Sequence, residues 1–182
     1  PQLDAATASG PAALLELAKQ YPQDARIPRA LSQSYSSQKN GIEALRFMAK
    51  AVSLDASSVP EDEVKQAATL AMSTSEGAET AVTLLESELG AVGVDVLYAL
   101  ASRPPQSRLK ARLNQSLAKP EVRAHASQAA QIALELRAAE KCEAKHAVLG
   151  RAAKQGDHRT LEQLRPLLQT RNCGTMGLVD CW

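Results

Sequence analysis

The sequence predicts an all-α protein, and its composition supports that class in three ways. Its 182 residues are 45% hydrophobic, which suffices for a substantial core in one domain or one repeat array. The apolar residues are mainly Ala and Leu, which favour helices. The low content of aromatic residues, 3%, together with only nine glycines, favours closely packed helices over a β-sheet fold.

Apolar periodicity and helix-breaking residues predict three helices in the first part of the chain. Pro11 stands in the first turn of one helix, and Asn40-Gly41 ends another. Leu45, Met48 and Val52 recur at spacings of three and four, as on one face of an amphipathic helix. The expected helices cover about residues 11–21, 28–39 and 42–53.

Seven further helices are expected after residue 56. Glu61, Asp62 and Glu63 suit the first turn of a helix, where acidic groups stabilise the helix dipole and require no metal. Pro104-Pro105 stops an apolar helix, and Gly156-Asp157 separates the last two. The expected ranges are about 61–72, 76–89, 92–101, 106–117, 120–137, 141–155 and 159–168. Residues 172–182 are expected to form an irregular tail.

Residues 27–56 resemble one tetratricopeptide repeat. The resemblance rests on Leu31, Tyr35, Ala44, Met48, Ala51 and Leu54, while Ser32 and Ala56 depart from the usual Gly and Pro. Pro22 precedes Ala56 by one 34-residue step, so we expect a preceding repeat whose second helix is 11–21, and a sequence that begins within a repeat. The resemblance implies a right-handed α-solenoid of about ten antiparallel helices. A closed helical bundle is the structural alternative.

The predicted organisation has three parts, and the charge divides the chain into two. Residues 1–90 are expected to form tetratricopeptide-like hairpins, 91–171 a degenerate continuation or cap, and 172–182 a cysteine-containing tail. Residues 1–102 carry 7 Lys or Arg against 13 Asp or Glu, and residues 103–182 carry 14 against 7. Oppositely charged ends can attract charged partners, but solvated helix faces explain the same pattern.

The last forty residues resemble the C-terminal end of myxobacterial serine/threonine kinases that carry tetratricopeptide-type repeats. The resemblance rests on Cys142, Gly156-Asp157, Cys173-Gly174 and Asp180-Cys181. It implies a bacterial origin and a kinase domain outside this sequence, which has no GxGxxG, HRD or DFG motif.

The three cysteines are the only group of residues in the sequence that suggests a metal site or a disulfide. Cys142 and His146 share a helix face, and with Cys173 and Cys181 they would supply four zinc ligands. A disulfide joining Cys142 to Cys173 or Cys181, or Cys173 to Cys181, is a second interpretation, and buried free thiols are a third. Paired cysteines would place the segment outside the cytoplasm, and unpaired ones inside it.

The expected function is non-catalytic binding of a protein or peptide, with no cofactor and no membrane span. The three histidines, His125, His146 and His158, lie on different expected elements and outside any hydrolase-like motif. Arg29, Gln33 and Ser36 are the candidate groove residues on the inner helix of the repeat. Two alternatives are a passive spacer or dimerisation element, and nucleic-acid phosphate binding, for which the candidate basic residues are Arg103, Arg108, Lys110, Arg112, Lys119 and Arg123.

Overall fold

Helices form every regular element in the part of the chain that this computed structural model describes, residues 1–102 and 107–168. The all-α prediction is therefore confirmed. The chain divides into two compact units, of which the first comprises residues 1–125 and the second begins at Ala126. Among the described residues, no helix is long and apolar enough to cross a membrane.

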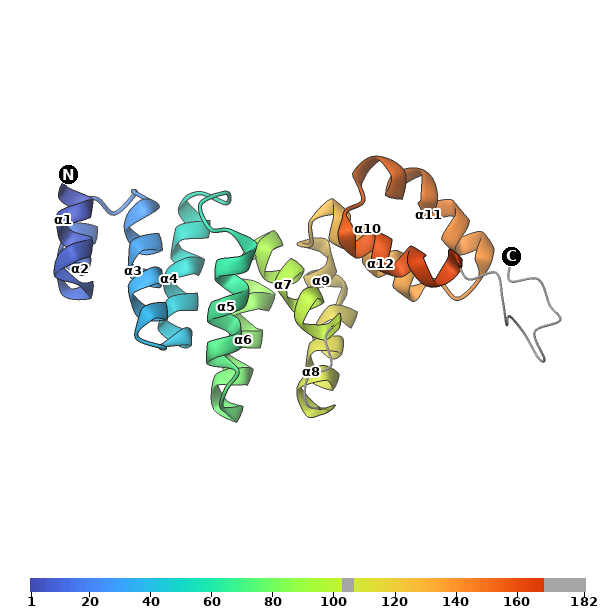
Figure 1. Ribbon diagram of the computed structural model, residues 1–182, viewed down its shortest axis with the longest axis horizontal. Helices are drawn as coiled ribbons and strands as arrows, with labels where there is room; N and C mark the ends of the chain where they lie inside the picture. The colour runs from blue at the N-terminus through green and yellow to red at the C-terminus, as the bar shows by residue number, and fades with distance from the viewer. Residues whose placement is uncertain (103–106, 169–182) are drawn as a thin grey trace. The chain divides into compact units, whose positions relative to one another are not determined.

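The helices of the first unit follow one another along the chain in short hairpins (Figure 1). They are α1 (Gln2–Ser9), α2 (Pro11–Gln20), α3 (Arg26–Ser37), α4 (Gly41–Leu54), α5 (Glu61–Ala71), α6 (Ser75–Ser87), α7 (Gly90–Ser102), α8 (Ser107–Ala118) and α9 (Pro120–Ala124). The described part of the second unit contains α10 (Gln128–Ala138), α11 (Cys142–Gln155), α12 (His158–Leu164) and the 3₁₀ helix η1 (Arg165–Leu168).

Two kinds of contact join the helices of the first unit. Each helix packs against the next one along the chain, from α1 on α2 to α8 on α9. Helices two apart also touch: α1 packs on α3, α5 on α7, α4 on α6, and α6 on α8. Alternate helices of the first unit therefore pack on one another in these pairs.

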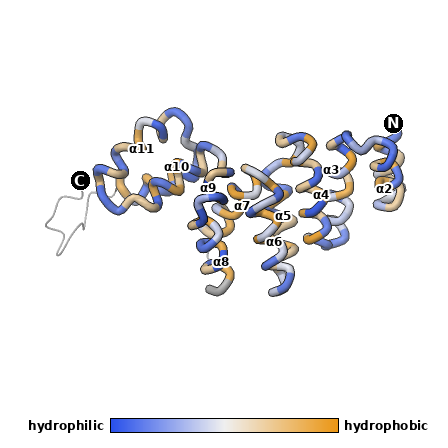
Figure 2. Tube along the Cα trace, turned by 180° about the vertical axis from the view of Figure 1, so that it is seen from behind, coloured by the Kyte–Doolittle hydropathy of each residue, from blue (hydrophilic) through white to orange (hydrophobic). Residues whose placement is uncertain are grey.

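The apolar stripe of each helix accounts for this packing (Figure 2). On α4, Leu45, Met48 and Ala49 are buried as their periodicity predicts, and Val52 is half-buried. The second unit has a separate core, in which Ile132 and Leu136 of α10 meet Val148 and Ala152 of α11. Each unit thus has its own apolar core.

The described residues hold twelve α-helices where about ten were expected. The first additional helix is α1, which the sequence did not predict because its apolar pattern is weak. Its Leu3 and Ala6 are only half-buried against the cluster around Leu14. The second arises because the expected helix 120–137 is two helices. The Ser127 hydroxyl accepts a hydrogen bond from the Ala130 N–H, which starts α10 afresh three residues after α9 ends.

The predicted division at residues 90 and 171 stays a prediction. Within the first unit the helix packing continues across residue 90, because α7 contacts both α5 and α6. The tail 172–182 lies outside the described residues.

Candidate functional site

The six residues that resemble the repeat signature lie on α3 and α4, and all except the half-buried Tyr35 and Leu54 are in the core. Leu31, Ala44, Met48 and Ala51 are at most 1% exposed. Tyr35 is half-buried and stacks on Phe47 of α4, with ring centroids 5.4 Å apart and planes inclined by 4°. The small side chains of Ala44 and Ala51 allow close helix packing, and the aromatic pair adds a contact between α3 and α4.

Gly41 sets the distance between α4 and α5. A Cβ at this position would lie 2.4 Å from the backbone nitrogen of Ala71 and 2.5 Å from the backbone oxygen of Ala67. Both distances are shorter than atoms in contact allow, so only glycine permits this approach. The backbones of the two helices therefore touch next to the candidate groove.

The structure brings two of the three candidate groove residues to one pocket. Gln33 and Ser36 of α3 line a pocket of about 360 Å³. The other residues that line it are Ser37, Met48, Glu63 and Gln66. The pocket thus lies where α3, α4 and α5 meet, and its polar groups come from the two odd-numbered helices.

The third candidate, Arg29, is held by an ion pair. Its Nη2 lies 2.7 Å from Oε1 of Glu63 on α5, and the Gln33 Nε2 is 3.5 Å from the same oxygen. The Arg29 and Glu63 side chains are 38% and 27% exposed. Two of their atoms, Arg29 Nε and Glu63 Oε2, are buried without a hydrogen-bond partner. Arg29 therefore does not present a free positive charge to the pocket.

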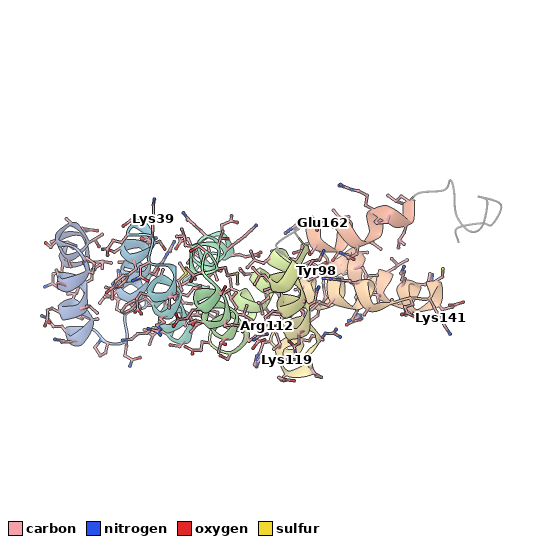
Figure 3. All side chains as sticks on the ribbon, turned by 90° about the horizontal axis from the view of Figure 1, so that it is seen from below. Lys39, Tyr98, Arg112, Lys119, Lys141 and Glu162 are labelled. Carbon is pink, nitrogen blue, oxygen red and sulfur yellow. The ribbon has the colours of Figure 1, made fainter. Side chains whose placement is uncertain are left out.

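A second ion cluster joins α6 to α8 and α9. The Arg112 guanidinium lies 3.0 Å from carboxylate oxygens of both Glu79 and Glu86, and Lys119 lies 3.0 Å from Glu86. Figure 3 labels Arg112 and Lys119 on neighbouring parts of the chain. Burial opposes ionisation of Glu86, but hydrogen bonds from Arg112, Ser116 and Lys119 outweigh it and lower the pKa of this carboxyl.

This cluster engages part of the basic region considered for nucleic-acid binding. Arg112 and Lys119 are ion-paired, and the Arg123 Nε donates to the Leu117 carbonyl. Lys110 is exposed. Arg103 and the Arg108 side chain lie outside the described residues.

Three of the ion pairs between helices share a nearly constant sequence separation, whereas Glu86 and Arg112 are 26 residues apart and Glu135 and Arg151 are 16 apart. Arg29 and Glu63 are 34 residues apart, Glu79 and Arg112 are 33 apart, and Glu86 and Lys119 are 33 apart. The first pair joins two odd-numbered helices, while Glu79 and Arg112 join two even-numbered ones. Sequence reasoning missed these pairs, although acidic and basic residues one repeat apart were a visible signal.

The cysteine expectations are only partly within the described structure. Cys142 begins α11 and is exposed, and His146, one turn later, is exposed as well. Cys173 and Cys181 lie outside the described residues, so the disulfide and zinc interpretations stay predictions. Within the part of the chain that is described, no three His, Cys, Asp or Glu residues form a group that could hold a metal ion.

The other two histidines occupy helix ends. His125 is exposed at the C-terminal cap of α9. His158 begins α12, and its Nδ1 lies 3.8 Å from Oδ2 of the capping Asp157. They lie on different units, and neither has a described Ser or Cys hydrogen-bonded to it.

Comparison with known proteins assigns no family. No protein-family profile, no curated protein and no solved structure matches this chain.

Proposed function

We propose that this chain is a non-catalytic helical-repeat module that binds a protein or peptide partner in the groove between α3 and α5. The observation that carries the proposal is the pocket beside Gln33, Ser36, Glu63 and Gln66. Its polar side chains come from α3 and α5, and Met48 of α4 completes the lining. Successive helices of a repeat array offer a continuous surface to an extended chain.

The proposed architecture is a right-handed α-solenoid of tetratricopeptide-like hairpins. Contacts between α5 and α7 and between α4 and α6 support it, because in a solenoid each helix packs on the equivalent helix of the neighbouring repeat, whereas a closed bundle has no such repeated stacking. The ion pairs at separations of 33 and 34 residues add support, since they match the 34-residue period of the resemblance.

The proposed biological setting is a regulatory or scaffolding segment of a larger bacterial protein. The resemblance of the last forty residues to the ends of myxobacterial serine/threonine kinases supports this setting. A kinase domain in the same polypeptide would be consistent with a binding module that recruits substrates or regulators.

The test is selection of binders from a displayed library of random peptides, followed by groove variants. Gln33→Ala removes a polar group from the pocket, and Ser36→Tyr fills it. We expect both to weaken binding of a selected peptide at least about tenfold, which corresponds to loss of about one good contact. Gln20→Ala, an exposed change on α2, is the matched control.

Two results would contradict the proposal. One is a library that yields no binder whose affinity depends on the protein being folded. The other is binding that Ser36→Tyr leaves unchanged, since the pocket would then be unused.

A further inference from the structure

The charge around the pocket distinguishes among peptide ligands. The pocket lining contains one ionisable side chain, that of Glu63, and no cation. The adjacent Arg29 is paired with Glu63 and does not add a free positive charge. Beyond the pocket, residues 1–102 carry 13 acidic against 7 basic residues. Arg29 and Glu63 offset each other, so an anionic ligand would meet no unpaired cation here, whereas a cation would meet the unpartnered Oε2 of Glu63 and the net negative charge of residues 1–102.

The lining also matches a side chain that is apolar along its length and charged at its end. Met48, 1% exposed overall, supplies the apolar part. Gln33 and Gln66 supply amide oxygens, and Ser36 a hydroxyl oxygen. At about 360 Å³ the pocket is near the small end of ligand sites, so it suits one side chain of a longer chain. Lysine has the required apolar stem and three N–H donors.

We propose that this pocket takes a lysine side chain from a basic, extended peptide, an inference that rests on the proposed binding function. The stem lies against Met48, and the ammonium donates to the Glu63 carboxylate and the neighbouring amide oxygens. Glu63 has capacity for this bond, because Oε1 accepts from Arg29 while Oε2 has no partner. Because Oε2 is buried, the incoming ammonium reaches the Glu63 carboxylate by partly displacing the Arg29 guanidinium.

Arg29 and the ligand compete for Glu63, so the direction in which the peptide affinity changes when Arg29 is replaced tests the proposal. If Arg29 bound the partner directly, its removal would weaken binding. Because Arg29 instead occupies Glu63, Arg29→Gln frees the carboxylate and strengthens binding of a basic peptide. Glu63→Gln does the opposite, since it removes the acceptor and leaves Arg29 as the local charge.

Fluorescence anisotropy with three labelled peptides tests this on the full chain. One peptide alternates Gly and Lys, the second Gly and Gln, and the third Gly and Glu. We expect the Lys peptide to bind most tightly and to weaken as salt is raised. Arg29→Gln should tighten its binding by about threefold to tenfold, and Glu63→Gln should weaken it at least about tenfold.

Matched variants separate the pocket from general charge. Arg46→Gln removes one positive charge from the exposed face of α4, and Glu88→Gln removes one negative charge at the end of α6. Both should change the affinity for the Lys peptide by less than about twofold, because exposed charges are screened. Thermal unfolding followed by circular dichroism establishes that each variant is folded.

Three results would overturn the lysine inference: no binding of the Lys peptide, weaker binding by Arg29→Gln in a folded variant, or equal effects of Glu63→Gln and Glu88→Gln. If the Gln or Glu peptide binds more tightly and Ser36→Tyr abolishes that binding, the lysine inference fails while the proposed peptide-binding function stands. Both the lysine inference and the proposed groove fail if Ser36→Tyr leaves the binding of the selected and the synthetic peptides unchanged.

Discussion

The Lys119 ammonium lies 3.0 and 3.1 Å from the two carboxylate oxygens of Glu86, which joins the start of α9 to α6. The same carboxylate also accepts from Arg112 of α8. Glu86 is only 11% exposed, so its two cations meet it in a partly desolvated place where an ion pair is stronger than at the surface. This carboxylate therefore connects three helices of the first unit.

Replacement of Glu86 should destabilise the first unit. Glu86→Gln leaves Arg112 and Lys119 with a neutral partner, and we expect the free energy of unfolding to fall by about 1–3 kcal/mol. Urea denaturation followed by circular dichroism measures the loss. Glu88→Gln, two residues away and exposed, is the control and should change stability by less than about 0.5 kcal/mol. Equal effects would mean that the cluster contributes no more than ordinary surface charge.

The same carboxyl predicts a dependence of stability on pH. The pKa of Glu86 lies below its ordinary value of 4.5, so the folded state binds its proton less readily than the unfolded state. Its contribution is fully present above 4.5 and is lost as the pH falls through the lowered pKa. Denaturation series at decreasing pH should therefore show a shallower loss in Glu86→Gln than in the parent chain. Parallel curves would refute the assignment.

Gly41 should tolerate no larger residue. In Gly41→Ala the new methyl group meets the backbone of Ala67 and Ala71, so we expect a loss of about 1–3 kcal/mol and faster hydrogen exchange in α4 and α5. Gly150 provides the contrast, because it lies within α11 and a Cβ added there would have no other atom within 4 Å. Gly150→Ala should stabilise α11 by about 0.5–1 kcal/mol. Hydrogen exchange by mass spectrometry resolves the two regions in the full chain.

Lys39 adopts a costly backbone conformation in the turn between α3 and α4. Its φ of 60° lies in the left-handed region, and its side chain is exposed, so Lys39→Gly should stabilise the fold by about 0.5–1 kcal/mol. Gln38, its neighbour, has a φ of −82°, which suits any residue. Gln38→Gly should therefore destabilise the turn. Thermal unfolding of the pair decides, and a loss of stability in Lys39→Gly would contradict the argument.

Cys142 should react readily in the reduced protein. Its side chain is exposed at the first residue of α11, so iodoacetamide should alkylate it without denaturant. Peptide mapping by mass spectrometry identifies the modified residue. The same labelling without reductant tests the disulfide prediction, because a bond to Cys173 or Cys181 would protect Cys142. Slow labelling in reductant would contradict its exposure.

Local sequence signals predicted most helices because they depend on neighbouring residues. Leu45 and Met48 mark the buried face of α4 through spacing alone, and Asn40 caps it by accepting from the Glu43 N–H. The weak pattern of α1 carried no such signal. The break between α9 and α10 was missed because Ala, Leu and Arg continue through it, and only the Ser127 cap marks it.

The candidate site was less accessible to sequence reasoning. Helix phase predicted Gln33 and Ser36 as groove residues on α3, and the structure places both beside one pocket, while their binding of a partner stays a prediction. It did not identify Glu63 or Gln66, which come from a helix about 30 residues later. Nor did it show that Arg29 is occupied, because an ion pair between α3 and α5 depends on how those helices stack.

Local sequence patterns were enough to predict that the protein is helical, where most helices begin and end, and that Leu31, Ala44, Met48 and Ala51 are buried. These features depend on propensity, capping and periodicity over a few residues. The contact of Arg29 with Glu63, and the contacts of Glu86 with Arg112 and Lys119, became visible only in the folded structure. Those pairs join residues 26 to 34 positions apart, and their distances follow from helix packing that no local pattern specifies.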